Sequence, residues 1–293
     1  MTELARSLPP GLAAIVTDFE LHQPTVVSLA DIAALSQQAG LKTPPSIVAD
    51  RLRRHGWLLA TGQRGMYEFA PGAHAGPYGH GDPFLVFRAA LALQATRATI
   101  NFEAAIALQS ALWLHGLSDR TPNQHELAAA PQAAVPQAVR REMRVVRYQA
   151  RLEPDLINGL PVHQAASLLV HLAAKPASVR NWAVFADALP DLVSLSSRPS
   201  NGGAESETTS NVSGETSLQI ELQGRSAATK TRLAYLLSGV APEISDRLQP
   251  QPATGVVYFG SRGPTRRFNS RFNIADTILP FDPSEIPALG EAA

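Results

Sequence analysis

The sequence predicts an α+β protein built from a small N-terminal domain and a larger mixed α/β domain. Residues 1–70 follow the order helix, helix, short turn, helix, hairpin. Residues 71–82 are rich in glycine, proline and histidine, which predicts a linker. In residues 83–293, apolar residues recur with helical spacing in some stretches and form short strand-like runs in others. We therefore expect two domains joined by the linker.

Composition supports two globular domains and excludes several chemistries. A chain of 293 residues accommodates two domains at about 100–200 residues each. The absence of cysteine excludes disulfides, thiolate nucleophiles, iron–sulfur clusters and cysteine-based zinc sites. No apolar run approaches the ~20 residues of a membrane helix, and residues 1–10 lack the pattern of a signal peptide. We expect a cytoplasmic protein that makes no membrane contact.

The first two helices are predicted by apolar spacing and by capping residues. Residues 10–21 follow a Pro-Pro pair and place their apolar side chains on one face: Leu12, Ile15, Val16 and Phe19. Residues 29–38 form the second predicted helix, with Ser28 as its N-cap and Asp31 in its first turn. Gly40 is expected to end this helix.

The third helix and a hairpin complete the N-terminal pattern. Thr43 is expected to cap a helix that has proline at its first position and stops at Gly56. On a helical wheel Val48 and Leu52 point to the core, and the residues pointing away are Ser46, Ala49, Asp50, Arg53 and Arg54. Residues 57–60 and 66–69 predict two strands joined by a turn. This order is typical of a winged helix-turn-helix domain, whose third helix recognises DNA.

Basic residues are concentrated in this third helix and the following turn. Between residues 42 and 64, five basic residues stand against the single acid Asp50, a net charge of +4. We expect Thr43, Ser46, Arg53 and Arg54 to enter the major groove. The predicted contacts to the DNA backbone are Lys42, Gln63 and Arg64. Two alternatives stay open: winged domains also serve as protein-docking modules, and clustered arginines can simply be a solvated face.

The larger domain has a mixed pattern of helices and strands. One predicted helix starts at Asp82-Pro83. Four further predicted helices cover residues 102–115, 163–174, 181–189 and 227–239. The predicted strands cover 125–129, 143–148, 256–259 and 271–274. Residues 196–217 are rich in serine, threonine, glycine and asparagine, which predicts a long polar loop.

Two further arginine clusters define a candidate second basic surface in this region. Its residues are Arg140, Arg141, Arg144, Arg147, Arg262, Arg266, Arg267 and Arg271. From residue 262 to 272 aromatic residues alternate with arginines, a pattern that stacks on bases and neutralises phosphates. The alternative is that Phe268 and Phe272 are core residues of a strand whose arginines face water.

The sequence carries none of the common catalytic patterns. It has no G-x-S-x-G serine-hydrolase motif, no phosphate-binding Walker loop and no D/E-x-K nuclease triplet. Among the histidines, His74 and His80 lack metal-ligand spacing, while His163 and His171 are expected to share a helix face, one capping and one packing. We expect a binding protein with no catalytic residues, no bound metal and no cofactor.

Several segments resemble the AbiEi family, the antitoxins of the AbiE abortive-infection type. The most specific is the run from Ser110 to Leu117, which is similar to the family pattern S-A-L-x-x-H-G-L. Weaker similarities are Arg64-Gly-Met-Tyr67, Asp82-Pro-Phe84, Gly159-Leu-Pro-Val162 with the helix that follows, and the late helix at 227–237. The chain departs from the family in one helix, where Ser167 replaces threonine and His171 lies near an expected acid.

This resemblance implies a DNA-binding transcriptional autorepressor that is also the antitoxin of a toxin–antitoxin operon. The winged helix would bind double-stranded DNA at inverted repeats in its own promoter. The C-terminal domain would counter a nucleotidyltransferase toxin, directly or indirectly. The alternative function is an RNA- or protein-binding adaptor that uses the C-terminal arginine-rich surface, with the winged helix as a docking module.

Overall fold

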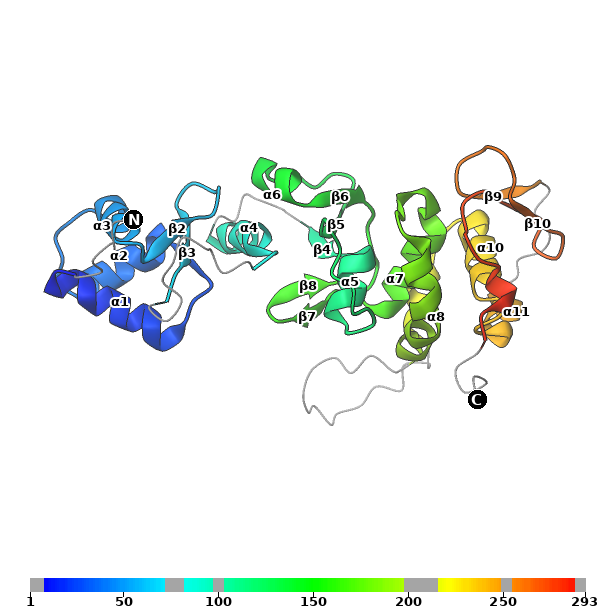
Figure 1. Ribbon diagram of the computed structural model, residues 1–293, viewed down its shortest axis with the longest axis horizontal. Helices are drawn as coiled ribbons and strands as arrows, with labels where there is room; N and C mark the ends of the chain where they lie inside the picture. The colour runs from blue at the N-terminus through cyan, green and yellow to red at the C-terminus, as the bar shows by residue number, and fades with distance from the viewer. Residues whose placement is uncertain (1–7, 72–81, 97–102, 198–215, 249–254, 288–293) are drawn as a thin grey trace. The chain divides into compact units, whose positions relative to one another are not determined.

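The computed structural model describes residues 8–71, 82–96, 103–197, 216–248 and 255–287 (Figure 1). Within these residues the chain forms helices and three sheets, which confirms the α+β class. Packing divides the chain into two compact units, Met1–Phe102 with Ala133–Met143 and Glu103–Gln132 with Arg144–Ala293. Most of the expected linker and of the expected polar loop, residues 72–81 and 198–215, lies outside the described residues.

The first unit begins with three helices and a small antiparallel sheet. The helices are α1 (Pro10–His22), α2 (Leu29–Gln38) and α3 (Pro45–Arg54). The strands are β1 (Val26–Ser28), β2 (Leu58–Ala60) and β3 (Met66–Phe69), in the spatial order β1-β3-β2. The sequence analysis missed β1, which is only three residues long. This arrangement is compatible with a winged helix.

The start of α2 shows how local sequence fixes the fold of this unit. The Asp31 backbone N–H donates to Ser28 Oγ at 3.1 Å, and the Ser28 N–H donates to the Asp31 carboxylate at 2.7 Å. This reciprocal capping box confirms the predicted N-cap, and such a cap contributes about 1 kcal/mol. Gly40, with φ of +67°, follows the end of the helix as predicted.

Two predictions about α3 are wrong. Its N-cap is Pro44 and no side chain caps the helix, so Thr43 does not do so. Ala49 was expected to face solvent but is fully buried with Val48 and Leu52. The reason is that α3 packs against both α2 and β2, so its buried face is wider than a stripe of two residues.

Two later helices pack with the first unit. Helix α4 (Leu85–Thr96) packs against β1 and β3, and the short helix α6 (Gln137–Glu142) packs against α4. Asp82 organises the start of α4, because its carboxylate accepts the Phe84 N–H at 2.9 Å and pairs with Arg88 at 2.7 Å. The compact unit therefore extends beyond the boundary expected near residue 83.

The second unit contains a mixed five-stranded sheet. Its strands are β4 (Ala104–Ile106), β5 (Glu126–Ala129), β6 (Arg144–Arg147), β7 (Asp155–Ile157) and β8 (Leu160–Val162), in the order β6-β5-β4-β8-β7. Helix α5 (Leu108–Leu114) follows β4, so the single helix predicted over 102–115 is wrong in its first half. Pairing of β4 with β5 and β8 overrides the helical preference of its alanines.

A helical layer adjoins this sheet. Helix α7 (Ala165–Ala174) is buried on every side from Ala165 to Ala173. It packs against α8 (Trp182–Ser196), α9 (Ser217–Leu222) and α10 (Ala227–Leu236), and α11 (Pro242–Leu248) packs against α10. Helix α8 continues through Pro190, beyond its predicted end at residue 189.

A small sheet completes the second unit. Strands β9 (Val257–Phe259), β10 (Arg267–Asn269) and β11 (Ile274–Asp276) have the spatial order β10-β11-β9. The strand predicted over 271–274 is wrong, because residues 270–273 form the turn between β10 and β11. Asn273 adopts a left-handed φ of +50° at the end of this turn.

Candidate functional site

The exposed side of α3 carries three of the predicted DNA contacts. Ser46, Arg53 and Arg54 are all exposed, while Val48 and Leu52 hold the opposite side in the core. Ser46 and Arg53 are seven residues apart, close to two helical turns, so they lie on the same face. Lys42 is exposed and Thr43 is partly exposed in the segment before the helix. The helix therefore presents a polar, basic face of the kind that enters a DNA groove.

Asp50 lies among these arginines and reduces their net charge. Its carboxylate is 2.5 Å from Arg54 Nη2 and 3.7 Å from Arg53 Nη2. All three side chains are more than one-third exposed, and such pairs contribute little to stability. These ion pairs therefore hold the two arginines only weakly.

The turn between β2 and β3 presents Arg64 to solvent. The buried hydroxyl of Thr61 donates to the Met66 carbonyl at 2.9 Å and closes the turn, while Gly62 and Gly65 take positive φ values. Arg64 is exposed, as a phosphate contact requires. Gln63 differs, because its Nε2 atom is buried and makes no hydrogen bond. That nitrogen is not available for the predicted contact.

Helix α6 places two arginines of the candidate second surface in the first unit. Arg140 and Arg141 are exposed on α6 and form no ion pair within the described ranges. Helix α6 lies beside the turn of the hairpin, since a methyl group on Gly62 would stand 3.9 Å from the Cβ atom of Ala138. These two arginines therefore lie on the same compact unit as α3 and Arg64.

The other six arginines of that surface lie in the second unit and are not equivalent. Arg144 pairs with Glu126 at 2.6 Å and donates to the Ser178 carbonyl at 2.5 Å. The guanidinium of Arg147 donates to the Ala130 carbonyl at 3.0 Å. Arg271 pairs with Asp246. The eight arginines are thus divided between two units, and several of them are engaged within the protein.

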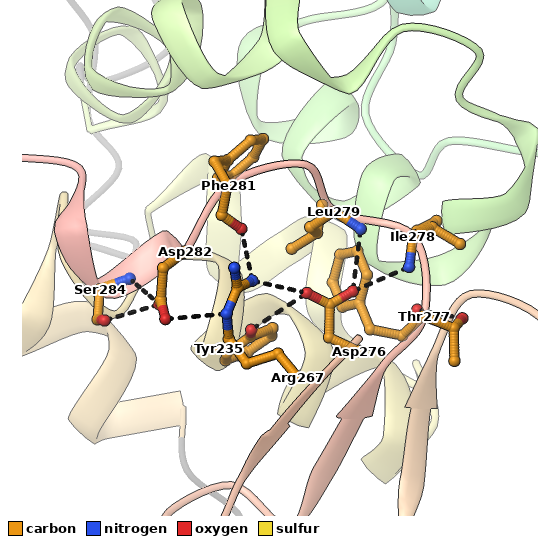
Figure 2. A network of polar contacts seen from close by, with 10 residues as sticks. Tyr235, Arg267, Asp276, Thr277, Ile278, Leu279, Phe281, Asp282 and Ser284 are labelled. Carbon is orange, nitrogen blue, oxygen red and sulfur yellow. Dashed lines mark hydrogen bonds and ion pairs between the residues drawn. The ribbon is translucent and has the colours of Figure 1, made fainter. Parts of the chain in front are cut away.

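Arg267 holds the small sheet to the C-terminal segment (Figure 2). Its Nη1 atom lies 3.1 Å from the Asp276 carboxylate and 2.7 Å from the Phe281 carbonyl, and its Nε atom lies 3.1 Å from Asp282. Asp276 is fully buried and also accepts the N–H groups of Ile278 and Leu279. With two carboxylates as partners, Arg267 serves the structure rather than a free basic surface.

The segment from Ser110 to Leu117 has a structural role in the described geometry. The Ser110 hydroxyl is buried, accepts the Glu126 N–H at 2.8 Å and lies 3.2 Å from His125 Nδ1. His115 Nε2 donates to the His163 carbonyl at 2.8 Å. Burial raises the pKa of Glu126, which nevertheless pairs with Arg144. These contacts fasten α5 to β5 and to the residues before α7.

Comparison with known proteins identifies this region. Residues 104–239 match the family model described as the AbiEi antitoxin C-terminal domain. We call the residues that this match covers the AbiEi domain. The resemblance inferred from the sequence is therefore confirmed over these residues. The AbiEi domain supports an antitoxin of a toxin–antitoxin system, and antitoxins of this family are not enzymes.

A solved structure supports the fold of nearly the whole chain. The crystal structure of the RV2827C protein from Mycobacterium tuberculosis superposes with a TM-score of 0.71 at 24% sequence identity, covering 94% of each chain. At this identity the likeness shows the fold alone. No curated protein matches the chain. Helices long and apolar enough to cross a membrane are absent from the described residues.

A buried polar cluster lies at the centre of the AbiEi domain. Glu221 is fully buried on α9 and pairs with Arg225, whose Nη2 atom is 2.5 Å away. The same carboxylate accepts the hydroxyls of Tyr148 at 2.9 Å and Ser167 at 3.1 Å. It also accepts two backbone N–H groups, those of Arg151 and Leu152. Every lone-pair direction of this carboxylate thus has a donor, which makes a buried charge tolerable.

Two buried histidines adjoin this cluster. His171 stacks on Tyr148 with ring centroids 4.0 Å apart, and His163 meets both rings edge-on. Burial lowers the pKa of His163 to about 4 and that of His171 well below its usual value. Both rings pack, and His163 precedes α7 rather than capping it. No group of three or more acids and histidines suited to a metal occurs in the described part of the chain.

The sequence analysis did not identify the Glu221 cluster. Only the spacing of Glu221 and Arg225, four residues apart, gave a sign of an ion pair. The other partners come from distant segments of the chain, since Tyr148 precedes α7 and Glu221 follows it. Asp50 lies three and four residues before Arg53 and Arg54, so its ion pairs with them also follow a spacing that is visible in the sequence.

Proposed function

We propose that this chain is a DNA-binding autorepressor and the antitoxin of a toxin–antitoxin operon, with a nucleotidyltransferase as its toxin. The observation that supports DNA binding is the exposed face of α3, where Ser46, Arg53 and Arg54 lie together. The observation that supports antitoxin activity is the AbiEi domain over residues 104–239.

In this proposal α3 enters the major groove of operator DNA. Arg53 and Arg54 donate to guanine edges, the commonest specific arginine contact in that groove. Ser46 lies about two turns nearer the start of the helix than Arg53 and hydrogen-bonds a neighbouring base or phosphate. Asp50 releases one arginine when DNA arrives, because its exposed ion pairs are weak.

Backbone contacts flank this helix. Lys42 lies just before α3, and Arg64 extends from the turn between β2 and β3. Arg140 and Arg141 of α6 lie in the same unit, with α6 packed beside Gly62 of that turn. We assign these basic side chains to phosphates on either side of the recognised groove. Their contribution is electrostatic, so it falls as salt rises.

The test of DNA binding is fluorescence anisotropy with the gene's own upstream duplex and a scrambled duplex, over a series of salt concentrations. We expect the upstream duplex to bind more tightly, with the difference persisting at about 150–200 mM salt. R53A should weaken upstream binding by about 1–3 kcal/mol. Arg51 is also exposed on α3 but is not among the proposed contacts, so R51A is the matched control. Equal binding to both duplexes would contradict a sequence-specific repressor.

Antitoxin activity needs a separate test. The full chain is co-expressed with a nucleotidyltransferase encoded beside it, and cell growth is measured. We expect the chain to restore growth, and we expect R53A to do so equally well when expression is driven from an unrelated promoter. Growth arrest in the presence of well-expressed wild-type chain would contradict the antitoxin assignment while leaving DNA binding untouched.

A further inference from the structure

The small sheet of the second unit has an outer face that carries two aromatic side chains. Strand register places Phe268 of β10 opposite Ala275 of β11, and Ala275 opposite Tyr258 of β9. Residues paired across neighbouring strands direct their side chains to the same face. Tyr258, Ala275 and Phe268 therefore form one row, with the small alanine between two aromatic rings.

The opposite face of this sheet is firmly anchored. Two rows of side chains lie on this opposite face. One row contains Val257 and Ile274, and the second contains Phe259, Asp276 and Arg267. Phe259 packs 5.4 Å from Trp182 and 5.9 Å from Tyr235, measured between ring centroids. The Arg267 network in Figure 2 ties the same face to Asp276 and Asp282. The outer row is thus held on a rigid support.

Phe268 on the outer face is exposed to an unusual degree. Its side chain is 54% exposed, whereas its neighbour in the turn, Phe272, is buried at 4%. The alternative interpretation, in which both phenylalanines are core residues, is therefore correct for Phe272 and wrong for Phe268. Tyr258 is partly exposed, and Ala275, which lies between the two aromatic residues in the row, is buried. An exposed ring fixed on a sheet is suited to stacking against a flat partner.

The charges around this row are positive. The Arg262 guanidinium carbon lies 5.7 Å from the centre of the Tyr258 ring. Arg266 immediately precedes β10, is exposed, and forms no ion pair with any residue that the structure describes. Nearby acids are already engaged, since Asp276 and Asp282 pair with Arg267 and Asp246 pairs with Arg271. The face combines two aromatic rings with two exposed cations, one of which, Arg262, lies over the Tyr258 ring.

We propose that this face binds single-stranded nucleic acid, with bases stacked on Phe268 and Tyr258 and phosphates held by Arg262 and Arg266. Aromatic rings on a sheet bordered by arginines are the features that single strands recognise. A protein partner fits less well, because one exposed phenylalanine and one partly buried tyrosine give too little apolar area for the core of a stable interface. A nucleic-acid base, in contrast, can stack on a single aromatic ring.

This inference does not depend on the proposed operator binding. The row lies on the second unit and uses none of the α3 or Arg64 side chains. A duplex also hides the faces of its bases within the stack, so a platform of rings favours unpaired strands. Failure of either proposal therefore leaves the other standing.

The experiment measures anisotropy of a fluorescent 12-nucleotide RNA of mixed sequence, and of DNA with the same sequence, with the full-length chain. F268A should weaken binding by about fivefold to a hundredfold, the range expected for loss of one stacked base. F268W should restore binding, because it retains a stacking ring. R266A should weaken binding and reduce its salt dependence.

The matched control is L156A, since Leu156 is 77% exposed on β7, a strand of the five-stranded sheet and not of the small sheet. L156A should bind the single strand like wild type, and F268A should bind the upstream duplex like wild type. Thermal unfolding of F268A should match that of wild type because the ring is exposed. Equal binding by F268A and wild type would overturn the proposal, as would displacement of RNA by polyglutamate as effectively as by unlabelled RNA.

Discussion

The Asp50 carboxylate pairs with the Arg54 guanidinium four residues later on α3, at 2.5 Å between Oδ2 and Nη2. This pair lies on the helix face that we assign to DNA, and Arg53 is within 3.7 Å of the same carboxylate. An acid in such a position limits attraction to phosphate. It also limits non-specific binding, because random DNA is held mainly through charge.

Replacing Asp50 therefore gives the first prediction. D50A should bind a scrambled duplex several-fold more tightly than wild type and show a steeper dependence on salt, measured by anisotropy. Its unfolding free energy should change by less than about 1 kcal/mol, because the ion pairs are exposed. D18A is the control, since it removes an acid of similar exposure from α1. Similar gains for both variants would mean that only net charge matters.

The second prediction concerns the arginines of α6. R140A/R141A should weaken binding to the upstream duplex and reduce the slope of log affinity against log salt by about 2, because each phosphate contact contributes about 0.9. The preference for upstream over scrambled DNA should remain, since phosphate contacts carry no base information. R120A/R180A removes the same charge from exposed residues of the second unit. An equal loss in this control would remove the specific role of α6.

The sequence predicted the first unit better than the second for a physical reason. The capping of α2 by Ser28 and Asp31 and the apolar face of α1 depend on residues within one or two turns. The segment from Ala104 to Ile106 instead becomes a strand because β5 and β8, far along the chain, pair with it. A local sequence pattern does not specify pairing partners that lie far along the chain. The alanine-rich residues before α5 therefore predicted a helix.

The candidate sites follow the same division. Exposure of Arg53, Arg54 and Arg64 was correctly predicted from helical spacing and from a turn. The engagement of Arg267 with Asp276 and Asp282 could not be predicted, because it arises only when β10 pairs with β11 and the C-terminal segment folds back. The arginine-rich run therefore contains a structural residue, Arg267, and exposed ones such as Arg262 and Arg266.

The third prediction concerns the buried carboxylate of the AbiEi domain. E221Q keeps the shape of the side chain but leaves Arg225 without its charge partner and adds donors where five donors already converge. We expect a loss of about 3–5 kcal/mol in the free energy of unfolding by urea, the range for breaking a buried pair. S167A, which removes a single hydrogen bond to the same carboxylate, should cost about 1 kcal/mol. Similar values for the two variants would show that the charge is unimportant.

The last prediction follows from the two buried histidines. Burial holds the pKa of His163 at about 4 and that of His171 well below its ordinary value, so the folded protein keeps both rings neutral. The unfolded chain takes up protons below about pH 6.5, and therefore binds more protons than the folded chain. Stability from these groups is present above that pH and is lost as the pH falls. For His163 the loss levels off below pH 4.

The measurement is urea unfolding between pH 7 and pH 4.5. Each neutral buried histidine should contribute a fall of about 1.4 kcal/mol per pH unit below the pKa of the unfolded chain. H171F retains the ring that stacks on Tyr148 but does not titrate, so it should remove about half of the slope that the two histidines supply. An unchanged slope in H171F would show that His171 gains its proton in the folded protein as readily as in the unfolded chain. The stacking of His171 on Tyr148 would then have to accommodate a charged ring beside Arg225, which lies 4.9 Å over the same tyrosine.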